Sequence, residues 1–244
     1  ISKLKENLLE RYFFKKLIRK EKQVREESLS NEKNIIDVNE ENQFKTKLKQ
    51  IRKQNLKVAI IDDDIEAGWE IGYKSLFGKK NIDYVYPKLT KEESDNPEIR
   101  KEKFKSFLSS IQSNNISLKK YDLIILDLRL YEKSSQDSSD ILDIENISGI
   151  KILNTIKNQT PDIPVIMCTA SNKSWSYDTA INMGAEGFWN KESPQYGMSL
   201  KYQFYNSYDL IETISKVVKW SSNIRPIYNA MDELALNIEL ENTP

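Results

Sequence analysis

Short apolar runs alternate with longer amphipathic stretches between residues 56 and 220. Five runs have the length of strands and carry β-branched or aromatic residues: 56–61 (LKVAII), 82–86 (IDYVY), 121–127 (YDLIILD), 164–169 (PVIMCT) and 186–191 (EGFWNK). Helical spacing of apolar residues follows each run, over 65–77, 99–112, from Gly149 onward, 174–183 and 209–220. This alternation predicts right-handed crossovers between parallel strands. The expected fold class is therefore α/β, a doubly wound five-stranded parallel sheet with helices on both faces.

Additional helices are expected at both ends of this unit. Residues 3–28 carry apolar residues at helical spacing, and 29–43 are rich in Asn, Glu and Ser and indicate a linker. A second short helix, with Phe44, Leu48 and Ile51 on one side, leads into the first strand, and the segment 221–244 looks helical again. The expected division is a charged helical N-terminal extension and linker over 1–55, a main domain over 56–222 and a C-terminal helical extension over 223–244.

The composition excludes several classes of function. Hydrophobic residues make up 39% of the chain and charged residues 30%, and no apolar run approaches the roughly 20 residues of a membrane helix. There is no histidine, which excludes Ser-His or Cys-His nucleophile pairs and histidine metal ligands. Cys168 is the single cysteine, so no internal disulfide can form, and a reducing cytoplasm is the expected location.

Charge and the chain ends add little to this picture. The net charge is zero, with residues 1–57 at +7, so direct nucleic-acid binding is not expected. The chain opens with ISKLKEN, without a signal-peptide pattern or an initiator Met, and is expected to be processed or part of a longer protein.

Chemistry-bearing side chains follow four of the five predicted strands. Asp62, Asp63 and Asp64 follow the first strand, Asp127 ends the third, Thr169 ends the fourth and Lys191 ends the fifth. Because the carboxyl ends of parallel strands share one edge of a sheet, these groups should lie together. Each of these residues alone has an ordinary structural explanation, such as an Asp that ends a strand or a solvated lysine. Their occurrence together at the same end of successive strands is what indicates a site.

A cluster of carboxylates without His or Cys is suited to Mg²⁺. Close carboxylates repel one another and need a cation, and Mg²⁺ prefers oxygen ligands. With the metal bound, one carboxylate can attack a phosphoryl group, while a lysine and a hydroxyl neutralise the charge on the transferred group. The sequence therefore predicts phosphoryl chemistry at this edge.

At these residues the chain resembles the response-regulator receiver family. VAIIDDD resembles that family's first strand with its acidic pair, YDLIILDLRL its third, IPVIMCTA its fourth and GAEGFWNK its fifth. The resemblance extends from Leu56 to Trp220, roughly two thirds of the chain, and implies the flavodoxin-like receiver fold.

The resemblance also implies roles for individual residues. Asp127 would be the phosphorylated residue and Thr169 and Lys191 its catalytic companions. Asp62, Asp63, Asp127 and the carbonyl of Arg129 would hold Mg²⁺, with Asp62 acting through water. Phe188 would be the switch aromatic.

The sequence departs from the family pattern in its loops. The family usually has a Pro soon after the phosphorylated Asp and a Gly about eight residues on. Here Gly149 lies 22 residues after Asp127, so the loop over 128–148 is enlarged. The separation of Asp63 from Asp127 is longer than usual, and the family's Lys-Pro reads Lys191-Glu192-Ser193-Pro194.

The expected function is a phosphorelay receiver in two-component signal transduction that switches a protein-interaction surface and is not a metabolic enzyme. Its expected partners are a histidine kinase or phosphotransfer protein and a downstream protein or effector domain, with no membrane contact, and the terminal helices are candidates for homodimerisation. The alternative is a degenerate receiver that serves as a constitutive protein–protein interaction module through the loop over 128–148 and the aromatic loop over 194–208. A Mg²⁺-dependent phosphatase is a weaker alternative, because position 129 is Arg where such enzymes have a second Asp.

Overall fold

The computed structural model of this chain describes residues 36–63, 65, 69–130, 147–169, 180–191 and 200–241. The expected helix over 3–28 and most of the expected helix over 174–183 lie outside these residues. Within the described part of the chain, no helix combines the length and the apolarity needed to cross a membrane.

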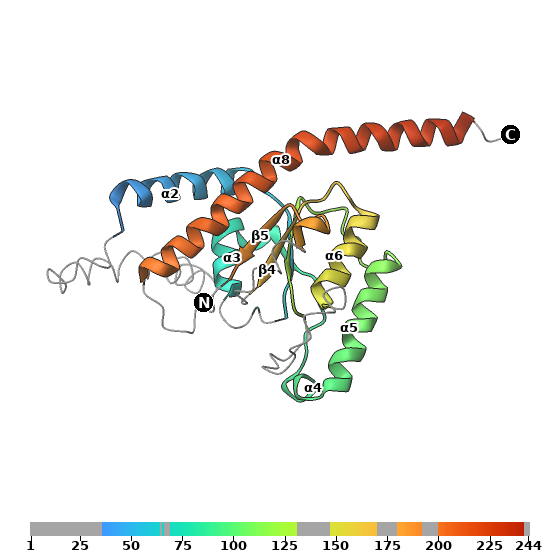
Figure 1. Ribbon diagram of the computed structural model, residues 1–244, viewed down its shortest axis with the longest axis horizontal. Coiled ribbons are helices and arrows are strands. Elements are labelled where there is room, and N and C mark those ends of the chain that lie inside the picture. Colours follow the sequence, from blue (N-terminus) through green and yellow to red (C-terminus); the bar gives the residue numbers. More distant parts are fainter. Residues whose placement is uncertain are drawn as a thin grey trace.

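Five parallel strands form one sheet in the order β2-β1-β3-β4-β5 (Figure 1). Every neighbouring pair is parallel, which confirms the expected doubly wound α/β fold. The edge strand β2 is shorter than expected, ending at Tyr84 rather than position 86. The strands are β1 (Val58–Ile61), β2 (Ile82–Tyr84), β3 (Leu123–Asp127), β4 (Val165–Thr169) and β5 (Gly187–Asn190).

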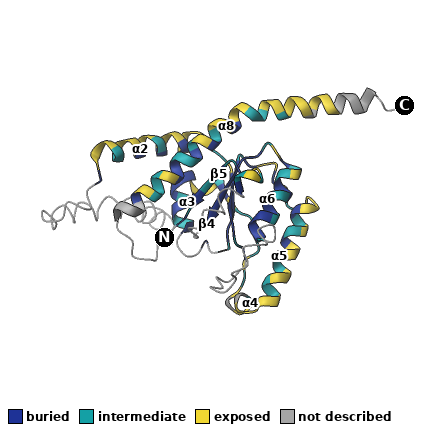
Figure 2. Ribbon diagram, in the orientation of Figure 1, coloured by how far each residue is buried: buried dark blue, intermediate teal, exposed yellow. Residues whose placement is uncertain are grey.

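Helices cover both faces of the sheet, and successive strand residues feed two separate apolar clusters. Helices α2, α3 and α8 pack on one face, and α5 and α6 pack on the other (Figures 1 and 2). The three inner strands are therefore buried along their whole length, as continuous apolar runs require. The helical elements are α2 (Val38–Lys53), α3 (Trp69–Phe77), η3 (Lys79–Asn81), α4 (Lys91–Asp95), α5 (Pro97–Gln112), α6 (Ser148–Gln159) and α8 (Leu200–Glu241).

Helix α2 begins inside the segment that the sequence predicted to be a linker. The side chain of Asp37 accepts a hydrogen bond from the backbone of Asn39 and caps the helix, and Glu40 and Glu41 lie in its first turn. These polar residues resemble a linker in composition, but acidic side chains at a helix start are stabilising. The linker assignment is therefore wrong for the residues from Val38 onward.

Helix α2 packs against the first turns of α8. The rings of Phe44 and Phe204 lie 5.1 Å apart, and the hydroxyl of Tyr205 donates to Glu40 at 2.5 Å. Because α8 begins at Leu200, the expected aromatic loop over 194–208 is wrong from that residue on. Phe204 and Tyr208 instead pack around Phe44, as aromatic residues at helical spacing do.

Helix α8 is continuous where the sequence indicated two helices. It runs through the predicted boundary between 222 and 223 and contains Pro226. The guanidinium of Arg225 contacts Asp122 at 3.0 Å, Asp162 at 3.3 Å and the carbonyl of Tyr121 at 3.0 Å. These contacts hold the middle of α8 against the segments that enter β3 and β4.

We expect Phe44→Ala to lower the free energy of unfolding by about 3 kcal/mol, because it opens a cavity between α2 and α8. Phe44 is 3% exposed, whereas Val38 in the same helix is 55% exposed. Val38→Ala should therefore change stability by about 0.5 kcal/mol or less. Urea unfolding of both variants measures the difference, and equal losses would show that α2 is not part of the core.

Candidate functional site

Three carboxylates meet at the carboxyl edge of the sheet. Asp62 and Asp63 directly follow β1, and Asp127 is the last residue of β3, the strand beside it. One oxygen from each of the three carboxylates lies within 4.8 Å of the others. Asp62 is 1% exposed and Asp127 is 7% exposed, so two of these charges lie almost entirely out of water.

The ammonium of Lys191 lies between two of these carboxylates. Its Nζ is 2.8 Å from Oδ2 of Asp62 and 2.9 Å from Oδ2 of Asp127. Lys191 directly follows β5, two strands away from β3, and only its long side chain reaches the cluster. Residues 129 positions apart in the sequence are thereby joined in one buried ion cluster.

The charge balance of this cluster is unfavourable for three ionised carboxylates. Burial raises the pKa of Asp127 to about 7, the charge of Lys191 opposes this shift, and the charges of Asp62 and Asp63 add to it. Burial acts to lower the pKa of Lys191, but the charges of Asp127 and Asp62 outweigh it and the pKa is raised. Lys191 is therefore ionised, and the cluster favours further positive charge.

The donor set fits a hard divalent cation. All three side chains offer carboxylate oxygens, and the described residues at this edge bring no nitrogen or sulfur ligand to the group. The backbone of Arg129 follows Asp127 by two residues and leaves the same strand end. These residues could hold Mg²⁺, which prefers a few carboxylates and retains water ligands.

Ser148 and Gly149 position the segment after Asp127. The amide of Leu130 donates to the buried hydroxyl of Ser148 at 2.7 Å, and the amide of Gly149 donates to the carbonyl of Leu128 at 3.0 Å. A Cβ on Gly149 would lie 2.3 Å from the carbonyl oxygen of Asp127. Only glycine therefore allows the start of α6 to approach the backbone of the site so closely.

Ser148 was not predicted as a site residue from the sequence. In the sequence, Ser148 is visible only as part of a Ser-Gly pair at the start of the predicted helix. Such pairs are common at helix ends and do not indicate a functional site. The function of Ser148 depends on the backbone of Leu130, 18 positions away, and no local pattern reveals that contact.

The other two predicted residues, Thr169 and Phe188, lie on β4 and β5, the strands that follow β3 in the sheet. Thr169 is 2% exposed, and its carbonyl accepts from the amide of Lys191 at 2.6 Å. In the register of β3 and β4, Asp127 is opposite Cys168, the residue before Thr169. Phe188 is half-buried and packs against the apolar cluster on the α5–α6 face of the sheet.

Cys168 and Tyr73 form the apolar floor beneath the carboxylates. Burial raises the pKa of the Cys168 thiol, and the charge of Lys191 opposes that shift only in part. Burial also raises the pKa of the Tyr73 hydroxyl, with the charges of Asp62 and Asp127 adding to it. Cys168 is thus a buried neutral thiol.

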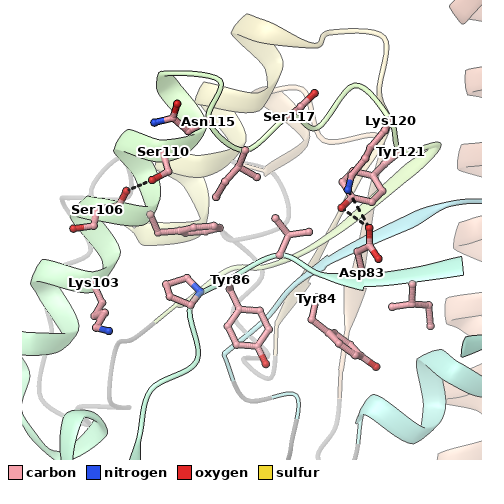
Figure 3. A pocket seen from close by; sticks show the side chains of 15 residues that line it. Asp83, Tyr84, Tyr86, Lys103, Ser106, Ser110, Asn115, Ser117, Lys120 and Tyr121 are labelled. Carbon is pink, nitrogen blue, oxygen red and sulfur yellow. Dashed lines mark hydrogen bonds and ion pairs between the residues drawn. The ribbon is translucent and has the colours of Figure 1, made fainter. Parts of the chain in front are cut away.

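A separate groove of about 920 Å³ lies beside β2 and α5 (Figure 3). Its lining includes Tyr86, Lys103 and Ser106, but none of the clustered aspartates. Asp83 accepts from the hydroxyl of Tyr121 at 2.8 Å, and Lys120 lies 3.2 Å from it. The acidic group of this groove is thus already neutralised by its neighbours.

One family model matches part of the chain. It is described as "Response regulator receiver domain" and matches residues 139–199. No curated protein matches the sequence.

Several solved structures are similar to the chain at low identity. One is a CheY-like receiver domain protein from Methanospirillum hungatei JF-1, with 15% identity, a TM-score of 0.39 and coverage of 68% of this chain and 95% of that one. Another is NtrX from Brucella abortus, with 17% identity and a TM-score of 0.39, covering 71% of this chain and 29% of NtrX. A third is the receiver domain of the histidine kinase CKI1 from Arabidopsis thaliana, complexed with Mg²⁺ and BeF₃⁻. It has 15% identity, a TM-score of 0.36 and coverage of 70% of this chain and 96% of that one.

We expect Gly149→Ala to destabilise the protein by about 2–4 kcal/mol and to weaken metal binding, because the new methyl group collides with the backbone of Asp127 and Leu128. Lys151→Ala, nearby in the same helix, should change stability by about 0.5 kcal/mol or less. Thermal unfolding of both variants tests this. A Gly149→Ala protein as stable as the wild type would show that α6 approaches the site less closely.

The raised pKa of Asp127 predicts a pH-dependent stability without divalent metal. The folded protein holds this proton up to about pH 7, whereas the unfolded chain releases it near the ordinary value of 3.8. The folded state therefore binds more protons between these values, and stability falls as pH rises through that window. Asp127→Asn removes the titration, so the variant should gain about 1–3 kcal/mol over the wild type between pH 4 and pH 7.

Urea unfolding in the presence of a chelator, at several pH values, measures this difference. Parallel stability profiles of wild type and Asp127→Asn would contradict the raised pKa.

Proposed function

Since this chain carries a receiver domain of the response regulator type, we propose that it accepts a phosphoryl group on the carboxylate of Asp127 and acts as a switch in two-component signalling. The observation that supports this most is the contact of one buried ammonium, Lys191, with Asp62 and Asp127 at the carboxyl edge of the sheet. A phosphoacceptor needs a carboxylate with a fixed positive partner, and this arrangement provides both.

Asp62, Asp63, Asp127 and the carbonyl of Arg129 are the proposed ligands of Mg²⁺. When bound, Mg²⁺ would neutralise charge on the phosphoryl oxygens and favour the ionised form of Asp127. The hydrogen bond between Leu130 and Ser148 supports this assignment, because it orders the backbone that carries Arg129. The proposed metal site is thus built from both strand ends and the start of α6.

The transfer step is a substitution at phosphorus. An oxygen of Asp127 attacks the phosphorus of a phosphohistidine on a partner kinase or phosphotransfer protein. A carboxyl O–P bond forms as the N–P bond breaks, and the bonding electrons stay on the imidazole nitrogen, which takes up a proton. The chain has no histidine of its own, so the donor is a separate protein or segment.

The phosphorylated carboxyl changes the balance around Lys191. The new phosphoryl oxygens carry more negative charge than the carboxylate that they replace, so they attract the ammonium of Lys191 and the hydroxyl of Thr169. Phe188 lies three residues before Lys191 and is the proposed switch aromatic. The chain promotes its own phosphorylation and slow hydrolysis, and its output is a changed surface for a downstream partner rather than a product.

Tryptophan fluorescence is the direct test, because Trp69 and Trp189 pack edge to face at 5.0 Å and Trp189 lies two residues before Lys191. We expect a saturable change on titration with Mg²⁺ and a second change on addition of beryllofluoride. Acetyl phosphate should add the mass of one phosphoryl group to the intact protein.

Asp127→Asn should abolish the beryllofluoride response and the added mass. Asp83→Asn, the same substitution on β2 away from the cluster, should leave both in place. A folded wild-type protein that shows neither response would overturn the proposal and leave a receiver fold that serves only for binding.

A further inference from the structure

The C-terminal half of α8 extends past the body of the domain (Figures 1 and 2). Arg225 makes its contacts with Asp122, Asp162 and Tyr121 at the amino ends of β3 and β4. Beyond it, α8 continues to Glu241, and its side chains up to position 235 are mostly exposed where they are described. At about 1.5 Å per residue, the segment 226–241 forms about 24 Å of free helix.

One side of α8 carries a stripe of large apolar side chains that begins at Trp220 and continues along the free helix. The stripe consists of Trp220, Ile224, Ile227, Met231 and Leu234, at successive steps of four, three, four and three residues. This spacing keeps the side chains on one line along a helix and is the a/d repeat of a two-stranded coiled coil. In the sequence, the isoleucine at 238 continues the same rhythm.

Four of the five side chains of the stripe are exposed, and Ile224 is partly buried. Trp220, Ile227, Met231 and Leu234 are 42%, 54%, 58% and 61% exposed. At about 100° per residue, Arg225 lies about 140° around the helix from the centre of the stripe, on the side that faces the domain. The described part of the domain therefore leaves these four side chains uncovered.

The positions that flank the stripe decide which partner helix fits. On one flank lie Tyr228 and Ala235, and on the other Asn223 and Ala230, none of them charged. Charges at these positions normally select between partners, and their absence leaves nothing to repel an identical helix. Alanines at the flanks also allow two helices to approach closely.

The acidic residues of this segment fall on different sides of the repeat: Glu241, the last residue of α8, falls on the line of the stripe, three positions after 238. Glu233 falls on an outer position of the repeat, where a second helix does not reach, and it is exposed. Its charge therefore favours solubility of the outer face and does not oppose pairing of two copies.

We propose that this stripe is a homodimerisation surface, on which the α8 helix of a second copy of the chain pairs as a two-stranded coiled coil. The surface lies at the opposite end of the sheet from Asp127, so the dimer does not require phosphorylation. The free segment holds fewer than three heptads, so the pair is expected to dissociate on dilution.

Sedimentation equilibrium of the full chain over a concentration series tests this proposal, with Met231→Lys as the disruptive variant. The wild type should approach twice the chain mass at high concentration. Met231→Lys buries an unpaired charge in the pair and should raise the dissociation constant by about tenfold or more. Asn229→Lys adds the same charge to the exposed opposite face of α8, about 160° around the helix from Met231. It should change the dissociation constant less than about twofold.

Circular dichroism first confirms that both variants keep the wild-type fold. A wild type that stays monomeric throughout, or a dimer that Met231→Lys and Asn229→Lys weaken equally, overturns the proposal.

A carbodiimide, which joins lysines to nearby carboxylates, identifies a different occupant. Glu241 lies on the line of the stripe by its position in the repeat. Links between Glu241 and lysines of residues 1–35 within a monomer would show that the basic N-terminal segment covers the stripe, and would overturn the proposal.

Discussion

The contact of Lys191 with Asp62 and Asp127 is the interaction on which the rest of the site depends. Two carboxylates that are less than a tenth exposed repel each other, and burial alone favours their neutral forms. An ammonium at 2.8 and 2.9 Å from the two groups reduces this cost only if β1, β3 and β5 end at the same edge. A shift of β5 by one residue would turn Lys191 to the other face of the sheet. The site therefore requires the parallel order and the register of the whole sheet.

The same strand end is joined to α8. The indole of Trp189 donates to the backbone carbonyl of Asn206 at 3.0 Å, and the side-chain amide of Asn206 donates to the backbone carbonyl of Asn190 at 2.7 Å. Asn190 directly precedes Lys191, and Asn206 lies in the part of α8 that packs on α2. In the proposed switch, a displacement of Lys191 towards a phosphoryl group would act on these two hydrogen bonds and hence on α8. The N-terminal helix α2, which packs against α8, would then belong to the responding surface.

The sequence predicted the strands and the acidic cluster well, because both follow from local patterns that the sheet repeats. VAII and LIILD are apolar throughout, and in a parallel sheet such runs must end at one edge, which places Asp62 beside Asp127. The extent of α2 and the continuity of α8 were not predicted. The segment 200–208 is helical because Phe204 packs against Phe44, from the far end of the chain, and Pro226 is accommodated in a helix that Arg225 holds to the sheet. Tertiary contacts of this kind outweigh the local signals for loops and helix ends.

The enlarged loop after Asp127 is compatible with a working site, because its geometry depends on the two ends of the loop. Gly149 is distant from Asp127 in the sequence, yet its amide bonds to Leu128 and its Cα lies against the carbonyl of Asp127. Lengthening such a loop two- to threefold costs only about 1 kcal/mol in closure entropy, because the cost rises with the logarithm of length. The hydrogen bond from Leu130 to Ser148 orders the first residues of the loop, including Arg129, whatever its length. The departure from the family's spacing therefore alters the surface beside the site more than the backbone that would hold the metal.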